Sequence, residues 1–329
     1  MKRLGSKLVL LMAFLMAFTV CGPSGLAAEK YPVKPITMID PWPPGGGVDI
    51  VGRVLASVAA EYLGQPLIMK YISGAAGVRG AEAVSRAKPD GYTIGLIAQG
   101  AIVNQSVSSP ERASFGKDDF VFLAQVTATP CVLVANPKAP FKTLPEMVEY
   151  VKKNPGKIVY SSSGRFGFVH TAFARLQKAT GIQGKMVHLP TKGGAAALKE
   201  CLGGHTMATG ATVAVCTPHI KGGTVIPLAI CDTERWPTLP EVPTVKEVLG
   251  MDVTPTQLWI APAVPKGTPA ERVEFLRDGF GKICKDQSAL KLAERAGDKI
   301  VYMDALAFQK KWDNEWKEGK EMSSILLEK

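Results

Sequence analysis

Three glycine-rich turns carry the residue types in this sequence that could bind an anion. They lie at 40–49 (DPWPPGGGVD), 161–167 (SSSGRFG) and 190–194 (PTKGG), and a segment of helical period follows each of them. The start of a helix presents backbone N–H groups without partners and the positive end of the helix dipole. Glycine lets a ligand come close to that backbone because it has no β-carbon. Three such turns favour anion binding, although each one alone is equally typical of an ordinary loop.

The common motifs of catalysis and metal binding are missing. The sequence has no GxSxG around the serines at 161–163, no HExxH and no Walker-type phosphate loop. The histidines at 170, 188, 205 and 219 lack metal-ligand spacing, so we expect no metal and no cofactor. An exported α/β hydrolase or transferase that uses Ser163 with His170 is the alternative, which an assay for turnover would separate from a binding protein.

The turns are embedded in an alternation of short apolar runs and segments of helical period, which predicts parallel strands joined by crossover helices. The expected strands are 36–40, 67–71, 93–98, 131–136, 157–162, 186–189, 225–231 and 258–263. The expected helices are 51–62, 78–87, 144–153, a helix after Phe168, 195–202, 269–285 and a last helix that carries Phe308, Trp312 and Trp316. Two α/β lobes follow from this order, and the carboxyl-terminal section should pack back on the first lobe.

Length and composition fit a folded, exported binding protein. The chain has 329 residues, 21% charged and 46% hydrophobic, enough for two lobes and unlike a disordered chain.

Basic residues at the start precede the apolar run 8–20 and small residues up to Ala28, which indicates a signal peptide at 1–28. Its removal lowers the net charge from +10 to about +7, with no basic and aromatic cluster for nucleic acid. We therefore expect a soluble periplasmic monomer.

The cysteines do not indicate a disulfide framework. Cys21 belongs to the leader, and Cys131, Cys201, Cys216, Cys231 and Cys284 remain, an odd number without a CxxC pair. Several of them lie beside apolar stretches, which favours buried thiols in the core, although a single bridge would be possible in an oxidising compartment.

Several segments in the same order resemble the Bug-type solute-binding receptors of tripartite tricarboxylate transporters. They include YPVKPITMIDPWPPGGGVDIVGRVLA, LGQPLIMKYISGAAGVRGAEAVSRAKPDGYTIGL, HLPTKGGAAALKECLGG and RWPTLPEVPTVKEVLG, and the resemblance covers essentially the whole chain after the leader. It implies a two-lobe periplasmic binding protein of type II (Venus flytrap), each lobe a mainly parallel sheet flanked by helices. Lobe 1 would comprise 29–128 and 243–329, lobe 2 would comprise 129–242, and two crossover strands would form the hinge.

The resemblance also implies a function and a set of ligand-binding residues. The receptor would close on a small carboxylate and deliver it to the large and small membrane subunits of the transporter. The positions that match the family's site, with neighbours that we add from the strand ends, are Trp42, Pro43, Pro44, Gly45, Gly46, Ser73, Ala75, Ala76, Gln99, Ser162, Ser163, Gly164, Phe166, His170, Thr191, Lys192, Gly193, Gly194, Ala211 and Thr212. Asp49 matches an acidic residue that we expect to cap its own helix.

Departures from the family pattern bear on the ligand. Phe166 and Gly167 stand where the family usually has glycine and a hydroxyl residue, Thr191 replaces a tyrosine, and the strand 206–212 lacks an acidic residue. The loss of an acid argues against a ligand with an ammonium group. An aromatic wall formed by Phe166 beside Trp42 favours a carboxylate with an apolar or aromatic body. Phe168 is expected to pack in the core instead.

Overall fold

The computed structural model describes residues 30–99, 101–108 and 114–327. The expected signal peptide at 1–28, with Cys21, lies outside the described residues. The described residues from 34 onwards form one compact unit, and residues 30–33 belong to a separate one. No helix in the described part of the chain is long and apolar enough to cross a membrane. The five cysteines among the described residues are free and buried, as expected of core thiols.

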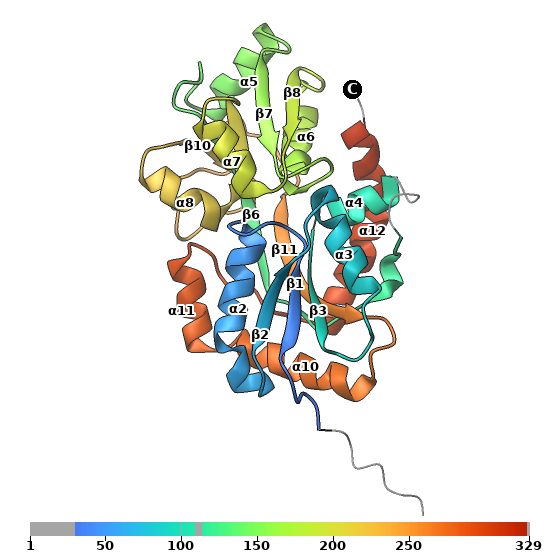
Figure 1. Cartoon of the computed structure of the whole chain (residues 1–329). Helices are drawn as coiled ribbons and strands as arrows, with labels where there is room; N and C mark the ends of the chain where they lie inside the picture. Colours follow the sequence, from blue (N-terminus) through green and yellow to red (C-terminus); the bar gives the residue numbers. More distant parts are fainter. Residues whose placement is uncertain (1–29, 100, 109–113, 328–329) are drawn as a thin grey trace, which may run out of the picture. The chain divides into compact units, whose positions relative to one another are not determined.

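The first strand group is a parallel sheet of three strands, β1 (Ile36–Asp40), β2 (Leu67–Tyr71) and β3 (Thr93–Ala98). β1 is the central strand and is almost entirely buried. Two helices cross over between the strands, α2 (Gly47–Leu63) and α3 (Val78–Ser85), and a one-turn 3-10 helix, η1 (Ala75–Gly77), precedes α3. These elements confirm the expected alternation, and Figure 1 shows them in blue to teal at the lower part of the unit.

The second strand group is also parallel and consists of β7 (Ile158–Ser162), β8 (Met186–Pro190) and β9 (Ala208–Thr212). Four helices surround these strands: α5 (Leu144–Lys153), α6 (Phe168–Thr180), α7 (Gly194–Leu202) and α8 (Val213–Lys221). The strand ends of this group and of the first strand group both carry helices that begin within a few residues, which is the local pattern that the glycine-rich turns predicted.

Two long strands join the groups. β6 (Thr127–Ala135) pairs through its first half with β11 (Gln257–Pro265) and through its second half with β9 and β10 (Ile226–Ile230). β11 pairs in turn with β3 and with β4 (Phe120–Phe122). All these pairs are antiparallel, so the sheet is mixed, in the order β2-β1-β3-β11-β6-β9-β7-β8. Figure 1 shows β6 and β11 running between the two groups.

The carboxyl-terminal helices lie mainly against the first strand group. α10 (Ala270–Ile283) and α11 (Gln287–Arg295) contact α2, and α12 (Ala305–Leu327) contacts α4 (Ala101–Ser108) and also α6. An aromatic cluster of Phe120, Phe122, Trp259, Phe308 and Trp312 fixes α12 to β4 and β11 with edge-to-face ring contacts. The remaining short elements are η3 (Lys117–Asp119), β5 (Ala124–Gln125), α9 (Val245–Leu249) and β12 (Met303–Asp304).

Candidate functional site

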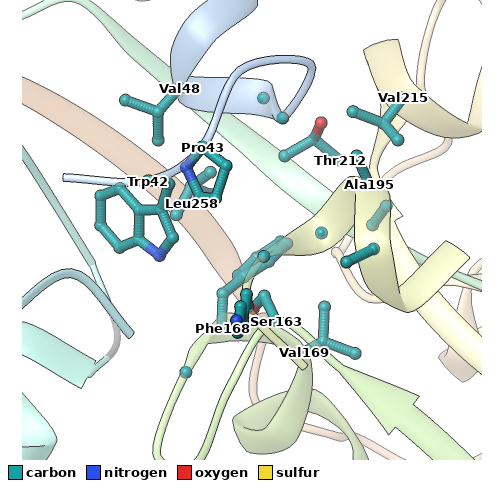
Figure 2. A pocket seen from close by; sticks show the side chains of 18 of the residues that line it. Trp42, Pro43, Val48, Ser163, Phe168, Val169, Ala195, Thr212, Val215 and Leu258 are labelled. Carbon is teal, nitrogen blue, oxygen red and sulfur yellow. The ribbon is translucent and has the colours of Figure 1, made fainter. Parts of the chain in front are cut away.

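A cavity of about 180 Å³ lies where the two strand groups face each other, and we call it the inner cavity. Figure 2 shows Trp42 and Pro43 on one side of it, and Ser163, Phe168, Ala195 and Thr212 on the others. Its lining consists of Trp42, Pro43, Pro44, Gly46, Gly47, Val48, Gln99, Ser163, Gly167, Phe168, Val169, Lys192, Gly193, Gly194, Ala195, Ala196, Ala211, Thr212, Val215 and Leu258.

Four helices begin at this cavity. The residues that precede α2, α6, α7 and α8 are Gly46, Gly167, Gly193 and Thr212, and all four line it. In the part of the chain that the structure describes, none of the four helices has a side-chain cap on its first N–H groups. Each start contributes about half a positive charge and several free donors. The sequence predicted the first three of these starts, and the structure adds the fourth, at Thr212.

Apart from these backbone groups, the walls are mainly apolar. Trp42, Val48, Phe168, Val215 and Leu258 give aromatic and aliphatic surface. Lys192 is the one charged side chain among the described lining residues, and it is exposed. Because the described lining contains no acidic side chain, nothing on it would neutralise an ammonium group. The cavity therefore combines a positive backbone end with an apolar body, which suits an organic anion.

The first turn is held by Asp49 from inside its own helix. The Asp49 carboxylate accepts hydrogen bonds from the Gly45 N–H at 2.8 Å, from the Tyr71 hydroxyl at 2.6 Å and from the Arg53 guanidinium at 2.9 Å. Burial would raise the pKa of Asp49, but these three donors together hold it below its ordinary value. Asp49 was expected to cap its own helix, but α2 has no side-chain cap, and Asp49 instead fixes Gly45 in the turn before the helix, where protein donors occupy its carboxylate.

Asp40 supports the same turn from the end of β1. One of its oxygens accepts a hydrogen bond from the Trp42 N–H at 2.8 Å, and the other has no partner among the described residues. The side chain is fully buried. Burial, with a smaller contribution from the nearby Asp49 charge, raises the pKa of Asp40 from 3.8 to about 7.

We therefore expect Asp40→Asn to make the protein more stable at pH 8 but not at pH 4. The raised native pKa means that the contribution of Asp40 to stability is complete below its unfolded value near 4 and is lost as the pH rises towards 7. The gain at pH 8 should approach about 4 kcal/mol, since each pKa unit corresponds to about 1.4 kcal/mol. Urea unfolding of both proteins at the two pH values measures it, and a gain that does not change with pH would contradict the assignment.

A second, larger cavity of about 540 Å³ lies on the other side of Trp42. We call it the basic crevice, because Arg79, Arg165 and Lys192 line it. Trp42 and Lys192 border both cavities. The other residues that line the crevice are Ser73, Gly74, Ala75, Ala76, Gly77, Gly164, Pro190 and Thr191.

The structure distributes the residues that the sequence predicted as a ligand site over three places. Trp42, Pro43, Pro44, Gly46, Gln99, Ser163, Lys192, Gly193, Gly194, Ala211 and Thr212 line the inner cavity. Ser73, Ala75, Ala76, Gly164 and Thr191 line the basic crevice. Gly45, Ser162, Phe166 and His170 line neither of the two. The assignment of these residues to ligand binding stays a prediction.

The two phenylalanines have exchanged the places that the sequence suggested. Phe168 lines the inner cavity, whereas the Phe166 ring packs with Ala174 and Leu326 beside Ala76. The cause is the backbone of Phe166, which has a positive φ of 62° and turns its side chain away from the path of the helix that follows. Phe168, in the first turn of α6, then provides the aromatic wall opposite Trp42, as Figure 2 shows.

His170, which is buried, and His188, which is half-buried, stack behind the second turn. Their ring centroids are 4.0 Å apart, and burial lowers the pKa of His170 to about 3 and that of His188 to about 4. His170 Nδ1 accepts a hydrogen bond from the Phe166 N–H at 3.0 Å, and His188 is hydrogen-bonded to the Ser162 hydroxyl at 2.6 Å. Among the described residues, no hydrogen bond joins Ser163 to His170, so the alternative catalytic pair is not assembled.

Close approaches between the two strand groups surround the inner cavity. A Cβ atom placed on Gly47 would lie 2.7 Å from both Thr212 Oγ1 and Cγ2. One placed on Gly193 would lie 3.3 Å from Pro43 Cδ, and one on Gly164 would lie 2.7 Å from Ala76 Cβ. Glycine is thus needed at 47 and 164 because elements of opposite groups touch there.

Sequence reasoning did not find some of the lining residues. Val48, Val169, Ala195 and Ala196 lie in the first turns of helices, directly after the predicted loops. Val215 lies in the first turn of α8, which no predicted loop precedes, and Leu258 lies on β11. The helix residues could have been inferred from their position at a helix start, but Leu258 had no local signal. In the described residues, no group of three or more His, Cys, Asp or Glu side chains is placed to hold a metal ion.

Comparison with known proteins gives consistent matches over most of the chain. The model of the family described as "Tripartite tricarboxylate transporter family receptor" matches residues 51–324. Protein BugT of Bordetella pertussis (strain Tohama I) is 33% identical over 252 residues, which cover 76% of this chain and 76% of BugT.

Two solved structures illustrate the similarity of the fold. The periplasmic binding protein BugD superposes with a TM-score of 0.82 at 26% identity, covering 91% of this chain and 99% of BugD. The structure of R. palustris Rpa4515 with adipate has a TM-score of 0.81 at 21% identity and covers 90% of this chain and 98% of that protein.

Proposed function

The chain belongs to the tripartite tricarboxylate transporter receptor family, and from this membership we propose that it captures a small organic carboxylate in the inner cavity and delivers it to the membrane subunits of such a transporter. The family and its structural neighbours are solute-binding receptors and not enzymes. The observation that carries the proposal is the meeting of four uncapped helix starts at one cavity.

The carboxylate group would lie against the first N–H groups of α2, α6, α7 and α8. Each helix start stabilises a nearby negative charge by about 0.3–1 kcal/mol, and by up to about 2 kcal/mol where the geometry is partly buried. Hydrogen bonds to a charged acceptor each contribute about 1.5–3 kcal/mol. Because Gly46, Gly167 and Gly193 have no side chain, an oxygen atom can reach these N–H groups directly or through a water molecule.

The remainder of the ligand would be apolar. Trp42 and Phe168 offer aromatic surface and Val48, Val215 and Leu258 offer aliphatic surface. Each CH₂ group buried there gains about 0.8 kcal/mol. The neighbour that contains adipate, a chain of four CH₂ groups between two carboxylates, supports a carboxylate with an aliphatic middle part, although adipate ends in a second acid group.

Two lobes would close around the ligand. Lobe 1 would comprise 29–128 and 243–329, and lobe 2 would comprise 129–242, with β6 and β11 as the hinge. A ligand that contacts α2 in one lobe and α6, α7 and α8 in the other favours the closed form by its differential affinity. The signal peptide would place this cycle in the periplasm, where the closed receptor meets the transporter.

A comparison of carboxylic acids with their amides tests the proposal. A carboxylate that binds the inner cavity should raise the unfolding free energy by about 2.7 kcal/mol at a concentration of 100 times Kd, whereas its neutral amide should not. A thermal-shift screen of aliphatic and aromatic mono-, di- and tricarboxylates, each with its amide, measures this, and mass spectrometry checks that the compound is recovered unchanged. Equal stabilisation by acid and amide, or consumption of the compound, would contradict a carboxylate receptor.

A further inference from the structure

The basic crevice gathers three cations from separate segments. Arg79 lies on α3, Arg165 in the turn that follows β7, and Lys192 in the turn that follows β8. All three side chains are exposed. Among the described residues no acidic side chain lines the crevice, and none forms an ion pair with these three cations. The crevice is thus a positive surface without an internal counterion.

The crevice exists because the two strand groups touch. Arg79 and the 73–77 turn come from the first strand group, whereas Arg165 and Lys192 come from the second. The position of a Cβ on Gly164 is 2.7 Å from Ala76 Cβ, so the two walls meet at this point. When the groups separate, the crevice is divided. It is therefore a feature of the closed protein, and closing brings like charges into one cavity at a cost in electrostatic energy.

The backbone at this seam is strained. Among the described residues that are not glycine, a positive φ occurs at Ala75 (48°), Ala76 (52°) and Phe166 (62°). Ala75 and Ala76 line the crevice, and the Phe166 ring packs beside Ala76. Each such residue costs on the order of 1–3 kcal/mol, and strain of this kind concentrates at functional segments. The shape of the crevice is thus maintained against both strain and charge repulsion.

We propose that the basic crevice is the surface by which the closed receptor binds an acidic segment of its membrane partner. This inference rests on the proposed function, because it presupposes a partner that must recognise the loaded receptor. Charge complementarity identifies the partner's chemistry, because exposed guanidinium and ammonium groups without counterions pair with carboxylate side chains. Because residues of both strand groups form the crevice, it is complete only in the closed receptor. A partner that binds it therefore distinguishes closed from open receptors.

A receptor locked in the closed form provides the test. The Gly47→Cys/Thr212→Cys variant has a Cβ–Cβ separation near 3.2 Å, slightly below the usual 3.5–4.5 Å of a disulfide, and the native cysteines are buried and should not interfere. The probe is a hexaglutamate peptide, with binding followed by calorimetry in low salt. We expect the oxidised variant to bind it at least about fivefold more tightly than the reduced variant. Raising the salt should weaken the binding.

Two charge substitutions locate the peptide. Arg79→Gln and Arg165→Gln should each weaken hexaglutamate binding to the locked form by about two- to fivefold, as expected of exposed ion pairs. Arg295→Gln is the matched control, since Arg295 is an exposed arginine on α11 and does not line the crevice. Lys192 is left unchanged because it also borders the inner cavity.

Three outcomes would overturn the inference: equal peptide binding by the oxidised and reduced forms, no effect of Arg79→Gln and Arg165→Gln, or binding of inorganic phosphate as tight as that of the peptide. The last result would assign the crevice to a free anion. Thermal stabilisation of Arg79→Gln and Arg165→Gln by a carboxylate from the screen separates the receptor function from the docking surface. If it persists while the peptide fails to bind, the receptor function stands and the docking surface does not.

Discussion

Gly46→Val should abolish carboxylate binding while the protein stays folded. Gly46 precedes α2 with an extended backbone, φ −87° and ψ 173°, which valine adopts readily. A Cβ placed there has Pro43 O at 3.9 Å as its nearest neighbour outside the adjoining residues, so the added Cβ itself meets no clash. It would, however, occupy the space from which a carboxylate reaches the start of α2. We expect a loss of affinity on the order of 100-fold or more.

Gly116→Val is the control for this experiment. Gly116 also precedes a helical turn with an extended backbone, φ −112° and ψ 179°, and has open space around its Cβ position, but it is exposed and does not line the inner cavity. The free energy of unfolding of both variants should differ from that of the native protein by no more than about 1–2 kcal/mol, the range of a helix-cap substitution. Calorimetry with the best carboxylate from the screen measures the difference. Unchanged affinity in Gly46→Val would remove the α2 start from the site.

Gly47→Ala should weaken ligand binding without weakening the fold. The new Cβ would lie 2.7 Å from Thr212, on the opposite strand group, so the groups could not come as close as they do here. Alanine is a better helix former than glycine, by up to about 1 kcal/mol, so the separated form should gain stability. The substitution therefore shifts the equilibrium away from closure, and we expect the Kd to rise about 10- to 100-fold.

A double-mutant cycle tests that explanation. Thr212→Ala removes the two atoms at 2.7 Å and leaves Thr212 Cβ at 3.2 Å from the new side chain, so Gly47→Ala/Thr212→Ala should recover a large part of the affinity. Gly281→Ala is the matched control, since Gly281 lies within α10 and a Cβ there meets Tyr302 at an ordinary 3.4 Å. It should leave the affinity unchanged. Additive effects of the two substitutions at 47 and 212 would show that their contact does not control closure.

Local chemistry made much of the fold predictable. The alternation of apolar runs and helical periods located most strands and helices within a few residues, because strand and helix have different hydrophobic periods. Glycines and hydroxyl residues marked the helix starts at 47, 168 and 194, because these residue types are favoured just before a helix begins. The start of α8 carried no glycine, and its importance became visible only when β9 was placed beside β6 and β7.

Features that depend on distant segments could not be inferred in this way. The contact of Gly47 with Thr212 joins two strand groups, and Leu258 reaches the inner cavity only because β11 crosses between them. Phe166 and Phe168 are two residues apart and equally apolar, so no pattern distinguishes them. The Phe166 ring, on a left-handed backbone, packs against Leu326 near the other end of the chain, a contact that no local pattern indicates.

The absence of side-chain caps on the four helices has a consequence for the receptor without ligand. If the two strand groups closed without a ligand between them, the first N–H groups of α2, α6, α7 and α8 would face a cavity of about 180 Å³ that holds few water molecules. A buried donor without a partner costs about 1–3 kcal/mol. Thr212 Oγ1, which has no partner among the described residues, would add to this penalty. Without ligand the closed form should thus be rare, and under the proposed function this would keep the vacant receptor from occupying the transporter.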